Sequence, residues 1–179
     1  MKFICFIILC LLPNSINSAL PQPLEPAPKK EHCIETPITP LSTDDSIRFI
    51  LREYNLPDTA IEFIVAQAKH ESGNYKNRLT REHNNIFARL HSRYDTLSKG
   101  PFGYAEGRSG YASYNSIKDA TVSQVKYFRR LKYSFNWKSS YEFAYELKKK
   151  RYYHDPKLSM KEDIRKYARA LRKHFKPPL

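Results

Sequence analysis

One carboxylate, Glu71, lies near the end of a predicted helix, on its buried face, where a protonated side chain is favoured. Glu71 follows Ile64 by seven residues and Ala68 by three, so it continues the apolar stripe of a predicted helix. Burial can raise the pKa of a carboxyl by several units, whereas the negative end of the helix dipole contributes only about 0.3–1 kcal/mol. Both effects favour the protonated form near neutral pH, the form that a general acid needs. Glu71 is therefore our candidate catalytic acid.

A purely structural role for Glu71 is the alternative interpretation. An ion pair with a nearby cation would leave it without a chemical role, and the cations close in sequence are Lys69, His70, Lys76, Arg78 and Arg81. A zinc-protease motif starting at His70-Glu71 would need a second His where Asn74 stands. Three further histidines, His83, His91 and His154, lack metal-ligand spacing. We therefore predict no metal and no cofactor.

The elements that position Glu71 are predicted to be mostly helices. Ser or Asp residues with N-cap chemistry, or a Pro suited to a first turn, precede stretches in which apolar residues repeat at helical spacing. These helices begin near Ser42, at Pro57-Asp58, near Ser116, at Ser139 and at Ser159, and the second ends at Gly73. All five glycines lie between residues 73 and 110, in a stretch without a helical period. This stretch is predicted to form an irregular lobe or a small hairpin.

The N-terminal residues have a different composition from the rest of the chain. Lys2 and ten apolar residues are followed by small and polar residues, a pattern typical of a signal peptide cleaved near Ser18. The alternative is an uncleaved N-terminal anchor. We predict a signal peptide over residues 1–18, a Pro-rich linker over 19–43 and one folded domain over 44–179, without stable membrane insertion after cleavage. Cys33 would then be the only cysteine left, so no internal disulfide is possible.

Four short segments follow one another in a recognisable order. They are Ala66-Gln67-Ala68-Lys69-His70-Glu71-Ser72-Gly73-Asn74-Tyr75, Asn84-Asn85-Ile86-Phe87, Gly110-Tyr111-Ala112-Ser113-Tyr114-Asn115-Ser116, and Tyr152-Tyr153-His154-Asp155-Pro156 with Tyr167-Ala168. Over roughly residues 45–175 they resemble the glucosaminidase domains that cut peptidoglycan, related to glycoside hydrolase family 73. The resemblance implies a mainly α (α+β), lysozyme-like fold with a small β-hairpin, and Glu71 as the catalytic acid.

The resemblance also implies residues that contact the sugar and a second catalytic group. The expected substrate contacts are Asn85, Phe87, Tyr111, Tyr114 and Tyr153, although tyrosines can also fill the rim of a core. Glycoside hydrolysis needs a second carboxylate or a substitute for it, such as the N-acetyl group of the substrate. The carboxylate candidates are Glu82, Asp95 and Glu106. Glu106 is preferred because it lies in a predicted turn, roughly where related domains place a second acid.

Two departures from the family pattern concern the sugar groove. The family has Gly, an apolar residue and Lys after the Phe, whereas Ala88, Arg89 and Leu90 follow Phe87 here. A charged insertion also separates Asp155 from Tyr167. Both departures bear on the shape of the groove and leave the acid in place.

Composition and charge agree with an exported enzyme that acts on an anionic polymer. Hydrophobic residues at 41% and aromatic residues at 13% suffice for one core and exclude a chain disordered throughout. The net charge of +13 suits the cell wall but equally suits nucleic acid. Export and the lack of a recognised motif argue against nucleic acid. We predict a monomeric, exported peptidoglycan hydrolase that cleaves next to N-acetylglucosamine; a wall-binding domain without catalysis is the alternative.

Overall fold

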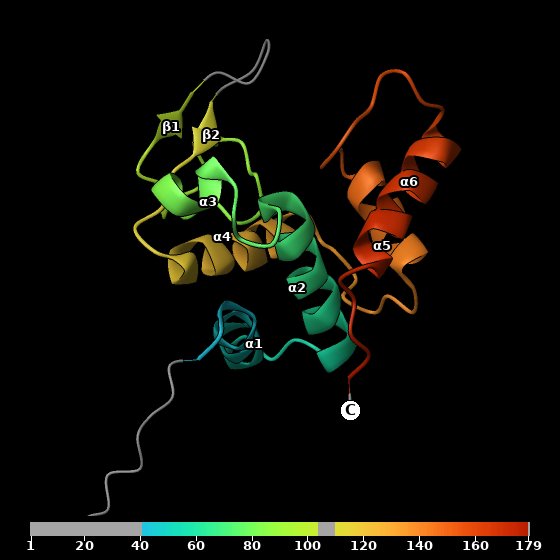
Figure 1. The fold of residues 1–179 in the computed structure, drawn as a ribbon, viewed down its shortest axis with the longest axis horizontal. Helices are drawn as coiled ribbons and strands as arrows, with labels where there is room; N and C mark the ends of the chain where they lie inside the picture. The colour runs from blue at the N-terminus through green and yellow to red at the C-terminus, as the bar shows by residue number, and fades with distance from the viewer. Residues whose placement is uncertain (1–40, 104–109, 179) are drawn as a thin grey trace, which may run out of the picture. The chain divides into compact units, whose positions relative to one another are not determined.

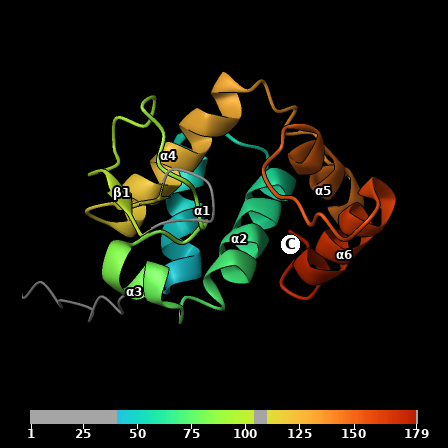
Figure 2. The same ribbon diagram turned by 90° about the horizontal axis from the view of Figure 1, so that it is seen from above.

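Helix α2 lies at the centre of the helical domain. The computed structural model describes residues 41–103 and 110–178, with helices α1 (Thr43–Glu53), α2 (Asp58–Ser72), α3 (Arg78–His83), α4 (Ile117–Arg130), α5 (Ser140–Lys149) and α6 (Met160–Arg172). Helix α2 packs against α1 and α6, α1 also packs against α4, and α5 pairs with α6 (Figures 1 and 2). Every residue from Ala60 to Ala68 is buried. Burial around the whole circumference makes α2 a core helix.

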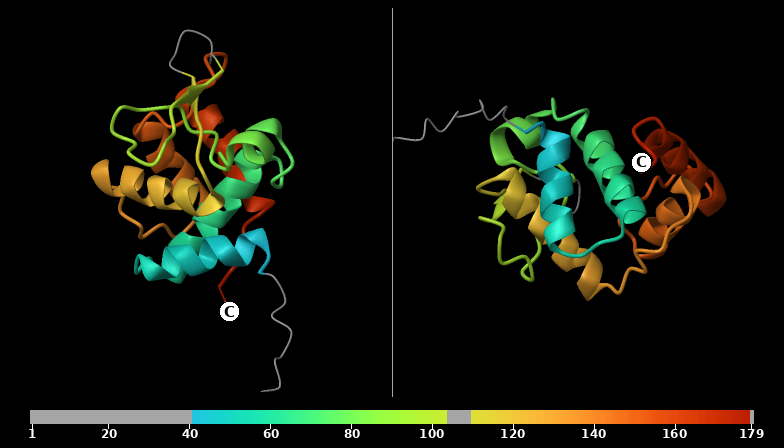
Figure 3. Two further views of the ribbon diagram at one scale, coloured as in Figure 1. Left: turned by 90° about the vertical axis from the view of Figure 1, so that its left-hand side faces the viewer. Right: turned by 90° about the horizontal axis from the view of Figure 1, so that it is seen from below.

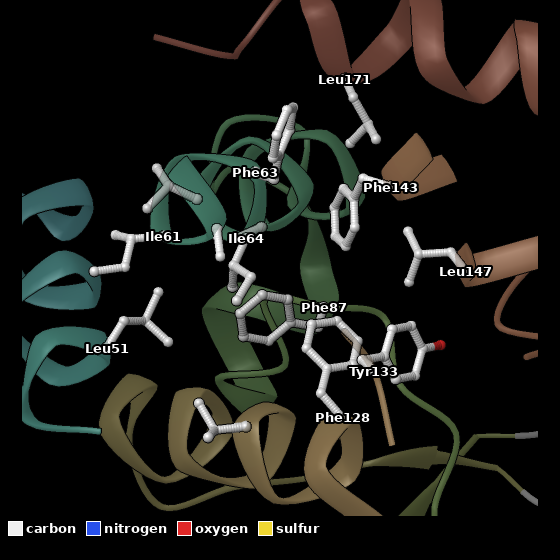
Figure 4. Packing of buried hydrophobic residues seen from close by; sticks show 14 of the residues in the cluster. Leu51, Ile61, Phe63, Ile64, Phe87, Phe128, Tyr133, Phe143, Leu147 and Leu171 are labelled. Atoms are coloured by element: carbon white, nitrogen blue, oxygen red, sulfur yellow. The ribbon is translucent and has the colours of Figure 1, made fainter. Parts of the chain in front are cut away.

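Aromatic side chains fill the space between α2 and its neighbours. Phe63 of α2 stacks on Phe175 with ring centroids 4.4 Å apart and contacts Phe143 of α5 at 5.7 Å. On the other side of α2, Ile64 and Phe87 lie near Phe128 of α4 (Figure 4). This packing holds the carboxyl end of α2, which carries Glu71, in a fixed place relative to α6.

Side-chain caps set the points at which five of the helices begin. Each capping side chain accepts a hydrogen bond from a backbone N–H three residues further on, and the caps are Ser42, Asn77, Ser116, Ser139 and Ser159. Ser159 and Glu162 complete a capping box, whereas Glu142 accepts from the backbone N–H of Lys138 rather than from that of Ser139. The predicted helix starts are confirmed.

The stretch between α2 and α4 holds one short helix and a two-stranded antiparallel sheet. Strands β1 (Pro101–Phe102) and β2 (Tyr111–Ala112) pair with Phe102 opposite Tyr111, and Leu90 forms a further bridge to Tyr111. The two strands are labelled in Figure 1, and Figure 3 shows the same domain from two further sides. Helix α3 was not expected, because its six residues are too few to display a helical period. The prediction of a mainly α, lysozyme-like domain with a small β-element is confirmed.

Several predictions concern residues outside those that the structure describes. The signal peptide over 1–18, nearly all of the linker over 19–43, Cys33 and Glu106 lie there and stay predictions. Within the described residues, no helix combines the length and the apolar character that crossing a membrane requires.

Candidate active site

Glu71 occupies the last turn of α2. This end of α2 lies between α3 and α6 in the ribbon view (Figure 1). Gly73 ends the helix in the left-handed conformation, with φ +59°. The Asn77 side chain donates a hydrogen bond to the Glu71 carbonyl at 2.8 Å, and Ser72 Oγ accepts one from the Tyr75 N–H at 2.8 Å. These bonds satisfy the end of the helix and fix the backbone that carries the carboxyl.

The carboxyl of Glu71 is paired with a tyrosine rather than with a cation. Its Oε1 accepts a hydrogen bond from the hydroxyl of Tyr167 on α6. No ion pair to Glu71 is found among residues 41–103 and 110–178. Two of the cations considered above are bound elsewhere: Lys69 Nζ lies 2.8 Å from Asp44, and Arg78 pairs with Glu82.

Burial of this carboxyl makes its protonated form accessible at neutral pH. Burial raises the pKa of Glu71 to about 7, and the hydrogen bond from Tyr167 offsets part of that rise. Within the described residues, Oε1 is the only carboxyl oxygen of Glu71 that accepts a hydrogen bond from a protein group. The other oxygen, Oε2, therefore keeps its hydrogen-bonding capacity unused by the described residues. A carboxylic acid with a pKa near 7 and one available oxygen can donate a proton.

Aromatic rings hold Tyr167 in place. Its ring stacks on Tyr153 with centroids 4.1 Å apart and planes only 8° from parallel, and His70 meets it edge-on at 5.2 Å. The Tyr153 hydroxyl donates to the carbonyl of Ala144 at 3.0 Å. Burial, followed by the proximity of Glu71, raises the pKa of Tyr167 well above its usual value, so its hydroxyl remains a donor.

A second tyrosine, the half-buried Tyr152, lies near enough to Glu71 for the charge of that carboxyl to act on it. The Tyr152 hydroxyl donates to the carbonyl of Phe87 at 2.6 Å. Burial and then the charge of Glu71 raise the pKa of Tyr152 well above its usual value. The site therefore joins the end of α2, the segment after α3, the loop between α5 and α6, and α6 itself.

The predicted sugar-contacting residues fall into two groups. The first group is buried: Asn85, Phe87 and Tyr114 are each at most 1% exposed, so they lie beneath the surface of the domain. Asn85 Nδ2 donates to the carbonyls of Arg89 and Ala112, and the Tyr114 hydroxyl donates to Asp95. Tyr111 in β2 and Tyr153 beside Tyr167 are partly exposed. Contact of these five residues with a substrate stays a prediction.

The candidate second carboxylates are in very different surroundings. The side chain of Asp95 is only 3% exposed. Burial alone would raise its pKa, but hydrogen bonds from Tyr114 and Ser123 and the charge of Arg89 outweigh it and lower the pKa. Glu82 is exposed, and its hydrogen bond with Arg78 lowers its pKa. Glu106 lies outside the described residues.

Two contacts at the candidate site were not predicted, that of Tyr167 with Glu71 and that of Tyr152 with Phe87. Tyr167 and Tyr152 stood within motifs that carry the family resemblance, but neither was expected to contact the acid or the segment after Phe87. The motif Tyr167-Ala168 was the only available signal for the first of them.

No cluster of three His, Cys, Asp or Glu side chains suited to a metal ion occurs in the described part of the chain.

Comparison with known proteins places the chain in a family. Residues 48–176 match the model of the glucosaminidase family, described as mannosyl-glycoprotein endo-beta-N-acetylglucosaminidase. Among solved structures, the chain is similar to one described as "Structure of a type VI secretion system effector-immunity complex from Pseudomonas protegens". That similarity has 18% identity and a TM-score of 0.47 and covers 74% of this chain and 93% of the other. No curated protein matches. The family match spans most of the chain and includes Glu71 and Tyr167, and the chain therefore belongs to the glucosaminidase family.

Proposed function

We propose that this protein hydrolyses the glycan strand of peptidoglycan next to N-acetylglucosamine, with Glu71 as the general acid. Membership of the glucosaminidase family supports glycan hydrolysis. The observation that carries the assignment is the half-buried carboxyl of Glu71, which forms no ion pair within the described residues, with one oxygen held by Tyr167 and a pKa of about 7. A group with this pKa holds a proton on about half of the molecules at neutral pH and can release it during the reaction.

In the proposed reaction, Glu71 protonates the glycosidic oxygen as the bond from that oxygen to the anomeric carbon breaks. The leaving sugar departs as an alcohol, and the anomeric carbon takes up positive charge. Either a second carboxylate, for which Glu106 is our candidate, or the N-acetyl oxygen of the substrate stabilises this carbon. Water then adds to the carbon, and its proton returns to Glu71, so that the acid is regenerated.

We further propose that the protein acts as an exported monomer. The support is the signal-like segment over residues 1–18 and the net charge of +13, which favours approach to an anionic wall. Expression of the full chain followed by fractionation tests this proposal. The expected product lies outside the cytoplasm and is shorter by about the length of the signal peptide, with a single-chain mass in solution.

Digestion of purified peptidoglycan tests the enzymatic assignment. We expect new reducing ends that mass spectrometry identifies as N-acetylglucosamine, and a loss of at least about 100-fold in rate for Glu71→Gln, in line with removal of a general acid. Glu53→Gln, at an exposed carboxylate at the end of α1, is the matched control. Reducing ends on N-acetylmuramic acid would reassign the bond. Binding to the wall without any reducing ends would make the protein a glycan-binding domain.

A further inference from the structure

A small basic pocket lies beside the candidate active site. It has a volume of about 220 Å³, and its lining includes Arg89, His91, Tyr127, Arg130, Arg151 and Tyr152. Tyr152 belongs to both places, because its hydroxyl bonds to the carbonyl of Phe87 and the charge of Glu71 acts on it. The next residue after Phe87, Ala88, also lines the pocket. Tyr152 is therefore common to the pocket and to the surroundings of Glu71.

The charge in this pocket is positive and largely uncompensated. No Asp or Glu of the described residues lines it. Arg130 and Arg151 are exposed, and neither forms an ion pair within residues 41–103 and 110–178. Arg89 is different, because it is buried, donates to Ser123 and lies 3.7 Å from Asp95. Two guanidinium groups thus remain available to an anion.

The Arg130 guanidinium and the backbone of Arg151 are held in place by neighbouring groups. The Arg130 guanidinium lies over the rings of Tyr94 and Tyr127, 4.8 and 5.8 Å from their centroids. Arg151 follows α5 with φ +59°, and its N–H donates to the carbonyl of Lys148 at 2.9 Å. The Arg130 guanidinium, held over two rings, loses less conformational entropy on binding than a free side chain would, which favours recognition of planar anions.

We propose that this pocket binds a carboxylate carried by a substituent of the glycan, so that the enzyme prefers glycan with peptide attached to its sugars. The inference rests on the proposed function, because peptidoglycan carries carboxylates on its stem peptides. Paired guanidinium donors suit a carboxylate, and a volume of about 220 Å³ suits a group the size of an amino acid rather than a sugar chain. Because Tyr152 lines the pocket and lies within reach of the charge of Glu71, a substituent held there would be on the same side of the domain as the acid.

Cleavage of two forms of one polymer tests the proposal. The substrates are native peptidoglycan and the same material with its carboxylates converted to neutral amides. We expect the full protein to cleave the native polymer about tenfold faster, the effect of roughly one charge-assisted hydrogen bond. In Arg130→Gln/Arg151→Gln this ratio falls to about one. Arg165→Gln/Arg172→Gln, which removes two exposed arginines of α6, is the matched control and keeps the ratio.

The outcomes separate this inference from the proposed function. Equal cleavage of both polymers by the unaltered protein, or an unchanged ratio in the pocket variant, overturns the pocket assignment. If the unaltered protein cleaves neither polymer, the enzymatic proposal fails, and co-sedimentation with native and amidated polymer decides the pocket assignment. The double variant could unfold because Arg130 no longer contacts Tyr94 and Tyr127, and circular dichroism would reveal this. In that case Arg151→Gln alone is used in its place.

Strands stripped of peptide identify which carboxylate binds. Removal of the peptide by an amidase exposes the lactyl carboxylate of the muramic acid and removes the carboxylates of the peptide. We expect the rate on stripped strands to fall to the level seen with amidated polymer. A rate equal to that on native polymer would overturn the assignment to the peptide and show that the lactyl carboxylate suffices.

Discussion

At the scale of single residues, two opposing effects determine the pKa of Glu71. Burial raises its pKa to about 7, and the hydrogen bond from Tyr167 limits the rise because that bond favours the ionised form. A general acid works only while it is protonated. We expect kcat/KM on peptidoglycan to be lost as the pH rises above about 7, by about tenfold per pH unit.

The Tyr167→Phe variant tests the cause of this pH dependence. Loss of the hydroxyl removes the contact that lowers the pKa of Glu71, so the falling limb of the pH–rate profile should move to higher pH. Tyr145→Phe, at an exposed tyrosine of α5, should leave the limb in place. A shift to lower pH in Tyr167→Phe would contradict the assignment of the limb to Glu71.

Ala88 carries backbone strain at the edge of the site. Its φ of +47° lies in the left-handed region, which costs a residue with a Cβ roughly 1–2 kcal/mol. Gly, which the family resemblance leads us to expect at this position, adopts this conformation without that cost. The greater flexibility of Gly in the unfolded chain offsets roughly 0.5–1 kcal/mol of the gain.

We therefore expect Ala88→Gly to increase the free energy of unfolding by about 0.5–1 kcal/mol, measured by urea denaturation. The same substitution at Ala170, inside α6, should lower the free energy of unfolding by a similar amount. Destabilisation by both substitutions would show that residue 88 is not strained in solution.

At the scale of elements, local patterns could predict most helices but not the contacts between them. Capping side chains and apolar stripes are local, so the start of α4 at Ser116 and the end of α2 at Gly73 could be predicted. Helix α3 could not, because six residues contain no measurable period. Glu71 could be recognised because both its stripe and its place at a helix end are local features.

The partner of Glu71 could not be found in the same way. Tyr167 is 96 residues away along the chain, and only the packing of α6 on α2 brings the two together. The same holds for Asp95, whose carboxyl meets Tyr114 and Ser123 in the interior. A carboxylate with such partners cannot be distinguished from a catalytic one by its position in the sequence.

The capping box of α6 stabilises the helix that supplies Tyr167. Ser159 Oγ accepts from the N–H of Glu162, and Glu162 accepts from the N–H of Ser159. Replacement of a capping Ser by Ala costs about 1 kcal/mol. We expect Ser159→Ala to lose about this free energy of unfolding in urea titrations. Lys161→Ala, exposed in the same turn and without a capping role, should change it by less than about 0.5 kcal/mol. Equal effects would argue against the cap.

At the scale of the whole molecule, groups with opposite pKa shifts determine how stability depends on pH. The pKa values of Asp44 and Asp95 are lowered, so their contribution is present above about pH 3.8 and is lost at lower pH. The pKa of His70 is lowered from 6.5, chiefly by burial. The unfolded chain therefore takes up this proton more readily than the folded protein, and stability falls as the pH drops below 6.5. Glu71 has the opposite effect between about pH 4.5 and pH 7, because its raised pKa makes stability fall as the pH rises.

Glu71 should make the folded protein less stable at the pH values where its carboxyl ionises. The folded state holds this proton up to about pH 7 and the unfolded chain only up to about 4.5, so stability falls between these values and stays low above them. The full effect is about 3 kcal/mol. Glu71→Gln cannot ionise, so it avoids this loss. The difference in free energy of unfolding between the variant and the unaltered protein should therefore grow in favour of the variant by about this amount from pH 4 to pH 8 in urea titrations. A stability difference that does not change with pH would mean that Glu71 titrates as an ordinary carboxyl, and the basis for its role as an acid would be lost.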